Sequence, residues 1–219
     1  HLPVETNRYL DIEPGLRVKY YHDTILNRFS WSLFRQLNQD LAWANVVHVQ
    51  AIFNSPIPIA LFFARKFEKP VLLSPHGVLG SWILKQGMPL KQLWLKYLIK
   101  PFSDYVYWHA TAEQEKLEIY SHFPEAKVEI IPNGVEISSF LNHSQYNQKT
   151  YFLKYTKNVR SNSPIIISMG RIHAKKGFDI LIRAFKEILV QFPAALLLIA
   201  GKDEGELPNL KKIIHELNL

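Results

Sequence analysis

The segment richest in potential chemistry is Met169–Gly177, with the sequence MGRIHAKKG. It stands between an expected strand and an expected helix, where a parallel α/β sheet forms its ligand crevice. The start of a helix offers an anion unpaired backbone N–H groups and the positive end of the helix dipole. Gly170 and Gly177 permit tight turns, while Arg171 and Lys176 can reach one anion from either side of the loop. The segment predicts a cradle for a diphosphate, with an ordinary surface turn as the alternative.

A second candidate site is the loop SPHGVLGSW at residues 74–82. His76 stands between a proline and a glycine, just beyond the carboxyl end of an expected strand. A histidine placed there can hydrogen-bond a sugar hydroxyl or a phosphate oxygen near neutral pH, although loop histidines without such a role are common. The strand-end loops add further candidates for binding a sugar or an acceptor: Asn54, Gly77, Thr111 and Glu113. Thr111 is equally explained as the start of a helix.

Short apolar strands alternate with helices from Val46 onward, an alternation typical of a parallel α/β sheet covered by helices. The expected strands are 46–49, 71–74, 105–109, 128–131, 165–168 and 195–200. The expected helices are 56–67, 90–99, 112–123 and 178–190, with another starting near Leu207. Before them, a weaker pattern predicts a strand at 16–21 and a helix at 25–41, capped by Asp23 or Asn27. The fold class is therefore α/β, with two Rossmann-like domains.

Residues 137–163 divide this pattern into two parts. Asn, Gln, Ser, Lys and Tyr dominate there and the periodicity fades, as expected of an interdomain connection. We expect one domain at 1–150, which includes much of this connection, and a second at 151–219. The chain opens at His1 without a methionine and closes at Leu219 inside an expected helix. The first domain is accordingly expected to lack its first strands, and the second to be truncated.

The excess of positive charge is concentrated in two stretches. The chain has 26 Lys and Arg against 19 Asp and Glu, a net charge of +7 over 219 residues. Residues 69–103 and 137–178 contain basic residues and no acid at all. Patches of this kind suit phosphate groups, anionic lipid or nucleic acid, and solvated surface lysines are the simpler explanation.

Composition excludes several kinds of site. The chain has no cysteine, so disulfides, thiolate nucleophiles and cysteine-bound metals are excluded. Its nine histidines lack metal-binding spacing, so we expect neither a metal nor a cofactor. The 169–177 loop matches neither the dinucleotide fingerprint nor the P-loop. No apolar run reaches the about 18 residues that a membrane-spanning helix needs. No nucleic-acid-binding motif is apparent, so no nucleic acid partner is expected.

The stretch 87–102 has two interpretations. Its apolar residues share one helical face and its lysines lie off that face: Leu90, Leu93, Trp94, Tyr97 and Leu98 against Lys91, Lys96 and Lys100. This pattern suits a basic helix that lies on an anionic membrane. The simpler interpretation is a helix that faces the core and exposes its lysines to solvent. We expect a cytoplasmic protein, and the first interpretation would place it peripherally on the inner face of the cell membrane.

Four motifs, in this order and spacing, resemble those of the retaining group 1 glycosyltransferases (family 4) of GT-B architecture. They are PHG at 75–77, TAEQEK at 111–116, IPNGVE at 131–136 and GRIHAKKGFDILIRAF at 170–185. The likeness is greatest to bacterial enzymes that build cell-surface or capsular polysaccharide. The resemblance implies transfer of a sugar from a nucleotide diphosphate sugar to a glycan or lipid-linked acceptor, with retention at the anomeric carbon.

The resemblance also implies roles for individual residues. Arg171 and Lys176 match the basic pair that holds the donor diphosphate in this family, and Gly170 and Gly177 match the glycines that shape its loop. His76 matches the loop histidine near the donor sugar, and is thus the candidate catalytic residue. By the same resemblance, domain 1–150 is the acceptor side and domain 151–219 the first part of the donor-nucleotide domain.

Two departures from the family pattern keep other functions open. The glycine-rich loop near the start of family members has no counterpart here. The family's pair of glutamates, seven residues apart, is expected beyond Leu219, because Glu204 and Glu206 stand too close together. The alternatives are therefore a truncated, inactive transferase remnant or a basic module that binds polyanions.

Overall fold

The computed structural model describes residues 4–22, 29–85, 87–138 and 164–219. The chain divides into two compact units, His1–Val135 and Glu136–Leu219. The connection expected at 137–163 lies almost wholly outside the described residues. No helix in the described parts is long and apolar enough to cross a membrane.

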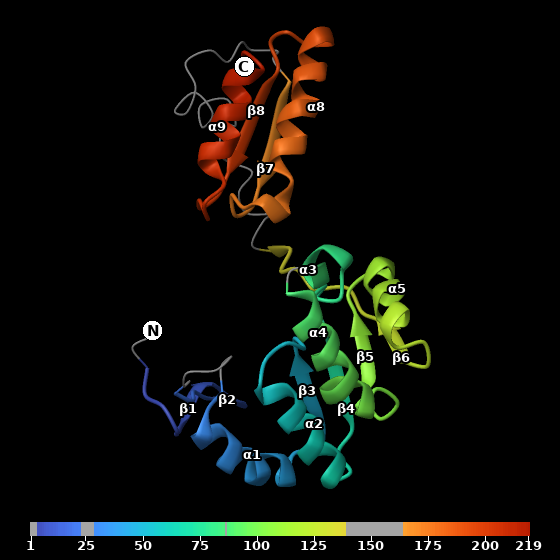
Figure 1. The fold of residues 1–219 in the computed structure, drawn as a ribbon. Helices are drawn as coiled ribbons and strands as arrows, with labels where there is room; N and C mark the ends of the chain where they lie inside the picture. Colours follow the sequence, from blue (N-terminus) through green and yellow to red (C-terminus); the bar gives the residue numbers. More distant parts are fainter. Residues whose placement is uncertain (1–3, 23–28, 86, 139–163) are drawn as a thin grey trace. The chain divides into compact units, whose positions relative to one another are not determined.

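The centre of the first unit is a four-stranded parallel sheet (Figure 1). Its strands are β3 (Val47–Gln50), β4 (Val71–Ser74), β5 (Tyr107–Ala110) and β6 (Lys127–Ile130). They lie in the sheet in the same order as in the chain. Each coincides with an expected strand to within two residues, so the predicted parallel arrangement is confirmed.

One face of this sheet is packed against the helices that join its strands. The helices are α2 (Pro56–Lys66), α4 (Met88–Trp94) and α5 (Glu113–His122). Alternate strand residues such as Val49, Leu73 and Trp108 join a single core with residues from these helical segments. Crossovers between parallel strands are right-handed, so neighbours in sequence order place every connecting helix on the same side. The intervening strand residues, including His48 and His109, face away from that core.

The helix expected at 90–99 is present, but its second half is π-helical: α4 runs directly into a π-helical turn (Leu95–Ile99). A short helix α3 (Ser81–Lys85) precedes this segment and a 3₁₀ turn (Lys100–Phe102) ends it. Pro101 lacks a backbone N–H, which fits the end of regular helix there. Leu95 and Ile99 are buried in the core, whereas Leu90 is 75% exposed. The apolar face that the core-facing interpretation of this stretch would place inside is therefore largely in solvent.

An antiparallel hairpin and a helix precede the sheet. The hairpin is β1 (Tyr9–Glu13) with β2 (Leu16–Lys19), and the helix is α1 (Trp31–Trp43). The strand expected at 16–21 is confirmed, but β1 was not predicted. The expected cap by Asp23 or Asn27 is wrong, because Ser30 caps α1: its extended backbone lets Oγ accept the N–H of Leu33. Residues 23–28 lie outside the described residues.

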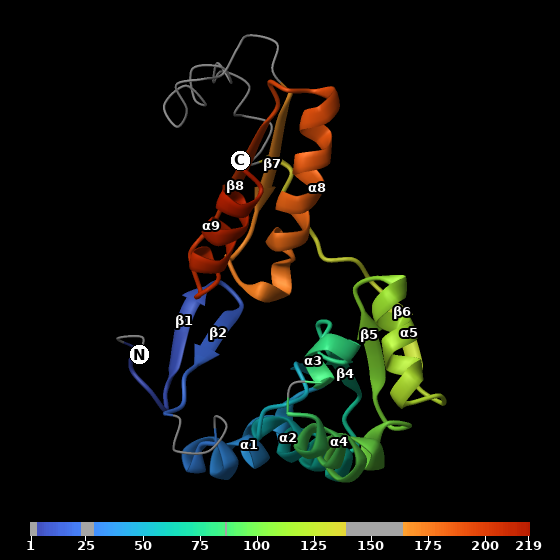
Figure 2. The same ribbon diagram turned by 45° about the horizontal axis from the view of Figure 1, so that its top comes forward.

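The second unit is a strand–helix–strand–helix sequence (Figure 2). It consists of β7 (Ile165–Met169), α8 (Phe178–Gln191), β8 (Leu196–Ala200) and α9 (Leu207–Glu216). The two strands are parallel, and α8 contacts both β8 and α9. Phe178, Ile182 and Leu210 are buried between these elements. All four elements agree with the sequence prediction.

Candidate functional site

His76 occupies a strained turn at the carboxyl end of β4. Its φ angle is +56° and that of Gly77 is +71°, so two consecutive residues adopt the left-handed conformation. Glycine tolerates this region, but a residue with a side chain seldom does. The His76 ring is exposed at this turn. Such an unfavourable backbone conformation persists only if contacts with the surrounding structure stabilise it.

The support comes from Glu115, a residue that sequence reasoning missed. Glu115 Oε1 accepts the N–H of Gly77 at 2.7 Å. Glu115 Oε2 accepts both the N–H and the hydroxyl of Thr111, each at 2.7 Å. The side chain is almost completely buried, with 5% of Glu115 exposed. A single carboxylate therefore ties the His76 turn to the end of β5.

The electrostatics of Glu115 favour the ionised form. Burial raises its pKa, but the two hydrogen bonds from Thr111, the one from Gly77 and the charge of the nearby His76 together outweigh burial. The net result is a pKa below the usual value for a glutamate. The carboxylate is thus a permanent negative charge beneath the turn at neutral pH.

Of the residues expected around this site, Gly77 and Thr111 are joined through Glu115, whereas Glu113 is not part of the contact. Glu113 is exposed in the first turn of α5. Asn54 lies half-buried in the loop after β3, where its carbonyl accepts the N–H of Ile57 at the start of α2. Thr111 and Glu115 are four residues apart across a helix start, one more than the spacing of a capping box, so the usual helix-start pattern does not point to this pair.

A row of hydrogen bonds crosses the sheet next to the His76 turn. Ser74 Oγ lies 2.8 Å from His48 Nε2 and 2.7 Å from His109 Nδ1, and His109 Nε2 lies 2.7 Å from the carbonyl oxygen of Ile131. A carbonyl only accepts, so His109 Nε2 donates to it. In the neutral ring Nδ1 then accepts from Ser74, which in turn accepts from His48.

This row, which we call the Ser74 row, was also missed by sequence reasoning. His48 and His109 lie within mostly apolar strands and Ser74 ends another, and this was the available signal. Partial burial of the ring and the neighbouring His109 and His76 lower the pKa of His48. Ser74 is fully buried, so it has no access to a substrate and acts as a structural bridge.

In the second unit, the expected cradle residues meet in one loop after β7. Gly170 and Arg171 follow the strand, and a 3₁₀ turn (Ala174–Lys176) leads to Gly177, whose φ of +66° starts α8. The aliphatic stem of Lys176 lies beside Gly170, 3.8 Å from the position a Cβ would take there. The turn itself is capped by His173 Nδ1, which accepts the N–H of Lys175.

This loop is fixed by backbone pairing with the loop after β8. The N–H of Gly170 donates to Ala200, that of Ile172 to Lys202, and that of Glu204 back to Ile172, at 2.8–2.9 Å. The pairing brings the chains so close that a Cβ on Gly201 would lie 1.7 Å from the carbonyl oxygen of Gly170. Gly201 is thus a required glycine that the motif did not reveal.

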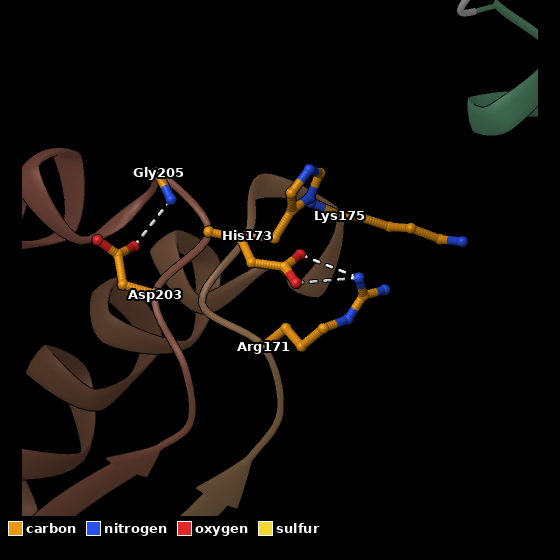
Figure 3. Close-up of polar contacts among 6 residues, drawn as sticks. Arg171, His173, Lys175, Asp203 and Gly205 are labelled. Atoms are coloured by element: carbon orange, nitrogen blue, oxygen red, sulfur yellow. Dashed lines mark hydrogen bonds and ion pairs between the residues drawn. The ribbon is translucent and has the colours of Figure 1, made fainter. Parts of the chain in front are cut away.

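The cationic side chains of the loop are exposed, and Arg171 has a partner within the chain. Its Nη1 lies 2.9 Å and 3.2 Å from the two carboxylate oxygens of Glu204 (Figure 3). Lys175 extends away from this pair in the same view. In the described residues no group of three or more His, Asp or Glu side chains is placed to hold a metal ion. The loop can therefore offer an anion two or three cations and the start of a helix.

Comparison with known protein families shows to which family the chain belongs. The family model for Glycosyltransferase Family 4 matches residues 5–139. The chain belongs to glycosyltransferase family 4. A second model, for glycosyl transferases group 1, matches residues 152–219 and includes the cradle loop. The family that the motifs predicted is confirmed.

Relatives from archaea and bacteria cover most of this chain. An uncharacterized glycosyltransferase of Methanocaldococcus jannaschii is 35% identical over 196 residues, which is 85% of this chain and 45% of the relative. The alpha-monoglucosyldiacylglycerol synthase of Streptococcus pneumoniae is 22% identical over 80% of this chain and 40% of its own length. This family 4 chain thus spans less than half the length of these relatives.

A solved structure supports the fold. The alpha,alpha-trehalose-phosphate synthase (UDP-forming) of Burkholderia vietnamiensis matches 87% of this chain and 50% of its own, with a TM-score of 0.51 and 13% identity. At this identity the likeness concerns the fold alone. Together with the parallel strands of both units, it confirms the predicted α/β class.

Proposed function

We propose that this family 4 chain takes part in moving a sugar from a nucleoside diphosphate sugar to a glycan or lipid-linked acceptor, with retention at the anomeric carbon. The observation that supports this most is the loop 170–177. It gathers Arg171, Lys176 and the start of α8 at the carboxyl ends of parallel strands, where an anionic ligand fits. We propose a cytoplasmic place in the synthesis of cell-surface polysaccharide.

In this reaction the cradle loop has to supply positive charges in fixed positions. When the sugar leaves, negative charge builds on the diphosphate oxygens. Cations already placed there stabilise the transition state more than the ground state. Arg171 supplies a planar fork of N–H donors and Lys176 a compact charge. The departing phosphate can accept the proton of the attacking hydroxyl on the same face of the sugar, a route compatible with retention.

His76 is proposed to act at the sugar rather than at the diphosphate. Its ring is exposed, and Glu115 holds the turn from below without itself reaching the surface. A ring carried on a backbone held in this way can hydrogen-bond a sugar or acceptor hydroxyl with little loss of backbone mobility on binding. The loops that contain Asn54 and Thr111 follow the flanking strands β3 and β5, and they are proposed to line the same acceptor side.

Calorimetric titration with UDP, GDP and ADP tests the donor site. Arg171→Ala and Lys176→Ala each remove a charge-assisted hydrogen bond worth roughly 1.5–3 kcal/mol, so affinity should fall about tenfold to a hundredfold. His76→Ala should leave nucleotide affinity unchanged. Wild-type affinity in Lys176→Ala would contradict the cradle.

Transfer itself is measured as release of the nucleoside diphosphate from UDP-, GDP- and ADP-sugars. The measurement uses this chain and its His76→Ala variant under the same conditions. His76→Ala should slow release without changing nucleotide affinity. Normal release by His76→Ala would exclude a role at the sugar.

We also propose that residues 82–100 contact an anionic membrane. Leu90, Leu93 and Tyr97 are more than half exposed on successive turns, and Trp82 is 43% exposed nearby in the sequence. Lys85, Lys96 and Lys100 are exposed around them, whereas Lys91 is tied to the carbonyl of Ile83 at 2.6 Å. Apolar and aromatic side chains flanked by lysines suit the surface of an anionic bilayer. A relative named for a glucosylated diacylglycerol supports a lipid acceptor.

Sedimentation with vesicles that contain phosphatidylglycerol tests this contact. Replacing Lys85, Lys96 and Lys100 by Gln should weaken binding by about 1 kcal/mol per charge. The matched control replaces the exposed Lys186, Lys211 and Lys212 of the second unit, with the same change in net charge. Equal binding by the two variants would contradict a membrane role for residues 82–100.

A further inference from the structure

The Arg171–Glu204 ion pair lies inside the proposed donor site. Arg171 Nη1 contacts Glu204 Oε2 at 2.9 Å and Oε1 at 3.2 Å (Figure 3). The two side chains are 64% and 32% exposed. An ion pair this exposed adds little to the stability of a fold. The pair matters for a different reason: Glu204 occupies Arg171, a cation that the proposed donor diphosphate needs.

The geometry of the pair makes it easy to displace. Both carboxylate oxygens share one guanidinium nitrogen, so the contact does not use the parallel fork that binds carboxylates and phosphates best. A diphosphate has more charge than one carboxylate and can take two parallel N–H groups of Arg171. It can also use Lys176 in the same loop. The exchange of carboxylate for diphosphate is thus favourable.

Glu204 is held beside the loop by the backbone, independently of Arg171. Its own N–H donates to the carbonyl of Ile172 at 2.9 Å, and Asp203 pairs with Ile172 in a parallel bridge. Asp203 Oδ1 in turn accepts the N–H of Gly205 and of Leu207, which ties the loop to the start of α9. After displacement, the Glu204 carboxylate would remain near the bound anion.

We propose that Glu204 is a built-in competing anion, which occupies Arg171 in the empty protein and is displaced when the donor diphosphate binds. The proposal rests on the proposed donor site and adds a residue that sets its affinity. Glu204 keeps Arg171 in an ordered position, lowers the affinity for every phosphate ligand and speeds release of the nucleoside diphosphate product. Neither of the two glutamates in this loop needs to touch the sugar for this role.

Calorimetry with inorganic pyrophosphate tests the proposal, because this probe does not depend on the unknown donor base. Glu204→Gln should bind pyrophosphate about three- to tenfold tighter than wild type, since it loses an ion pair and a nearby negative charge. Glu206→Gln is the matched control, because it changes the net charge by the same amount. Glu206 accepts a hydrogen bond from Asn209. This control should change affinity by less than about twofold, because Glu206 binds Asn209 and so does not occupy Arg171, and exposed charges that are not in contact interact weakly.

A double variant separates the ion pair from general charge effects. In the Arg171→Ala background, Glu204→Gln should no longer tighten binding, because the cation that Glu204 occupies is gone. Equal or weaker binding by Glu204→Gln, or an equal gain from Glu206→Gln, would overturn the competing-anion proposal. If Arg171→Ala weakens binding while Glu204→Gln does not tighten it, only this inference fails. If wild type and Glu204→Gln both fail to bind pyrophosphate, the donor site and this inference fail together.

Discussion

The His76 turn and the cradle loop both follow the carboxyl end of a parallel strand, but they are fixed in opposite ways. The His76 turn is held by the buried carboxylate of Glu115, which accepts three hydrogen bonds from Gly77 and Thr111. The His76 ring takes no part in these bonds and is exposed. The cradle loop is fixed by backbone pairing, and its charges remain at the surface, with Arg171 64% exposed. Charge is structural in the first loop and available to a ligand in the second.

The comparison predicts that the cradle loop depends most on its backbone. In Gly201→Ala the new Cβ would meet the Gly170 carbonyl at 1.7 Å, and backbone atoms have no flexible end that could move aside. The ends of β7 and β8 must then separate, at a cost of about 3 kcal/mol. Amide hydrogen exchange in the second unit should accelerate accordingly.

Gly170→Ala is the matched control, because its added Cβ would meet only side-chain atoms at ordinary distances of 3.7–3.8 Å. Tryptophan fluorescence gives an internal control as well, since all five tryptophans lie before residue 136 and report on the first unit. Unchanged exchange in Gly201→Ala would show that the two loops are not held by this close approach.

The first unit should depend on a charge instead. Glu115→Gln replaces one acceptor oxygen by an NH₂ group that faces the donors on Gly77 or Thr111. Unpaired buried donors of this kind cost about 2 kcal/mol, so the urea midpoint followed by tryptophan fluorescence should fall. Glu113→Gln, an exposed neighbour on the same helix, should leave the midpoint unchanged. An unchanged urea midpoint in Glu115→Gln would show that the His76 turn is stable without the Glu115 carboxylate.

The pH dependence of the first unit provides a finer test. The pKa of folded Glu115 lies below the ordinary glutamate value of 4.5, so its ionised form stabilises the fold fully above that value. This stabilisation is lost as the pH falls through the lower, folded pKa. The difference in unfolding free energy between wild type and Glu115→Gln should therefore be constant between about pH 6 and 8 and shrink towards about pH 3. A constant difference down to the lowest pH would contradict an ionised clamp.

The smallest effect is expected at the Ser74 row. Ser74→Ala leaves His48 and His109 without their shared partner but removes no charge, so the cost should be about 1 kcal/mol. Titration of His48 by NMR should change in this variant, while amide exchange in the cradle loop stays as it was. A wild-type titration curve for His48 would mean that its contact with Ser74 has no effect on the ring.

Sequence reasoning located the strands because their apolar residues alternate with helices at regular intervals, and it located the cradle because Gly170, Arg171, Lys176 and Gly177 are adjacent in the chain. It missed β1, which is short and mostly exposed. It also chose Glu113 over Glu115, because residues two apart at a helix start are equally plausible until the packing decides which one is buried.

The partners that come from distant parts of the chain could not be predicted. Glu204 reaches Arg171 only because Ile172 pairs with the loop after β8, and Gly201 is crowded only by the same pairing. The exposed side of α4 was undecided for a related reason. Its apolar face could have packed inward. In the structure Leu95 and Ile99, which lie in the π-helical turn that follows α4, pack in the core instead.

The order of strands in the first unit has a consequence for how the chain folds. Each strand of the sheet pairs with the strand that precedes it in the chain, so no pairing has to wait for a distant segment. Because the cost of loop closure rises with the length of the loop, pairing with the preceding strand keeps that cost low for a parallel sheet. On the ribosome, β4 would find β3 already present, and β5 and β6 could then add in turn. The sheet that supports the His76 turn can thus grow one strand at a time during synthesis, before the cradle loop has been made.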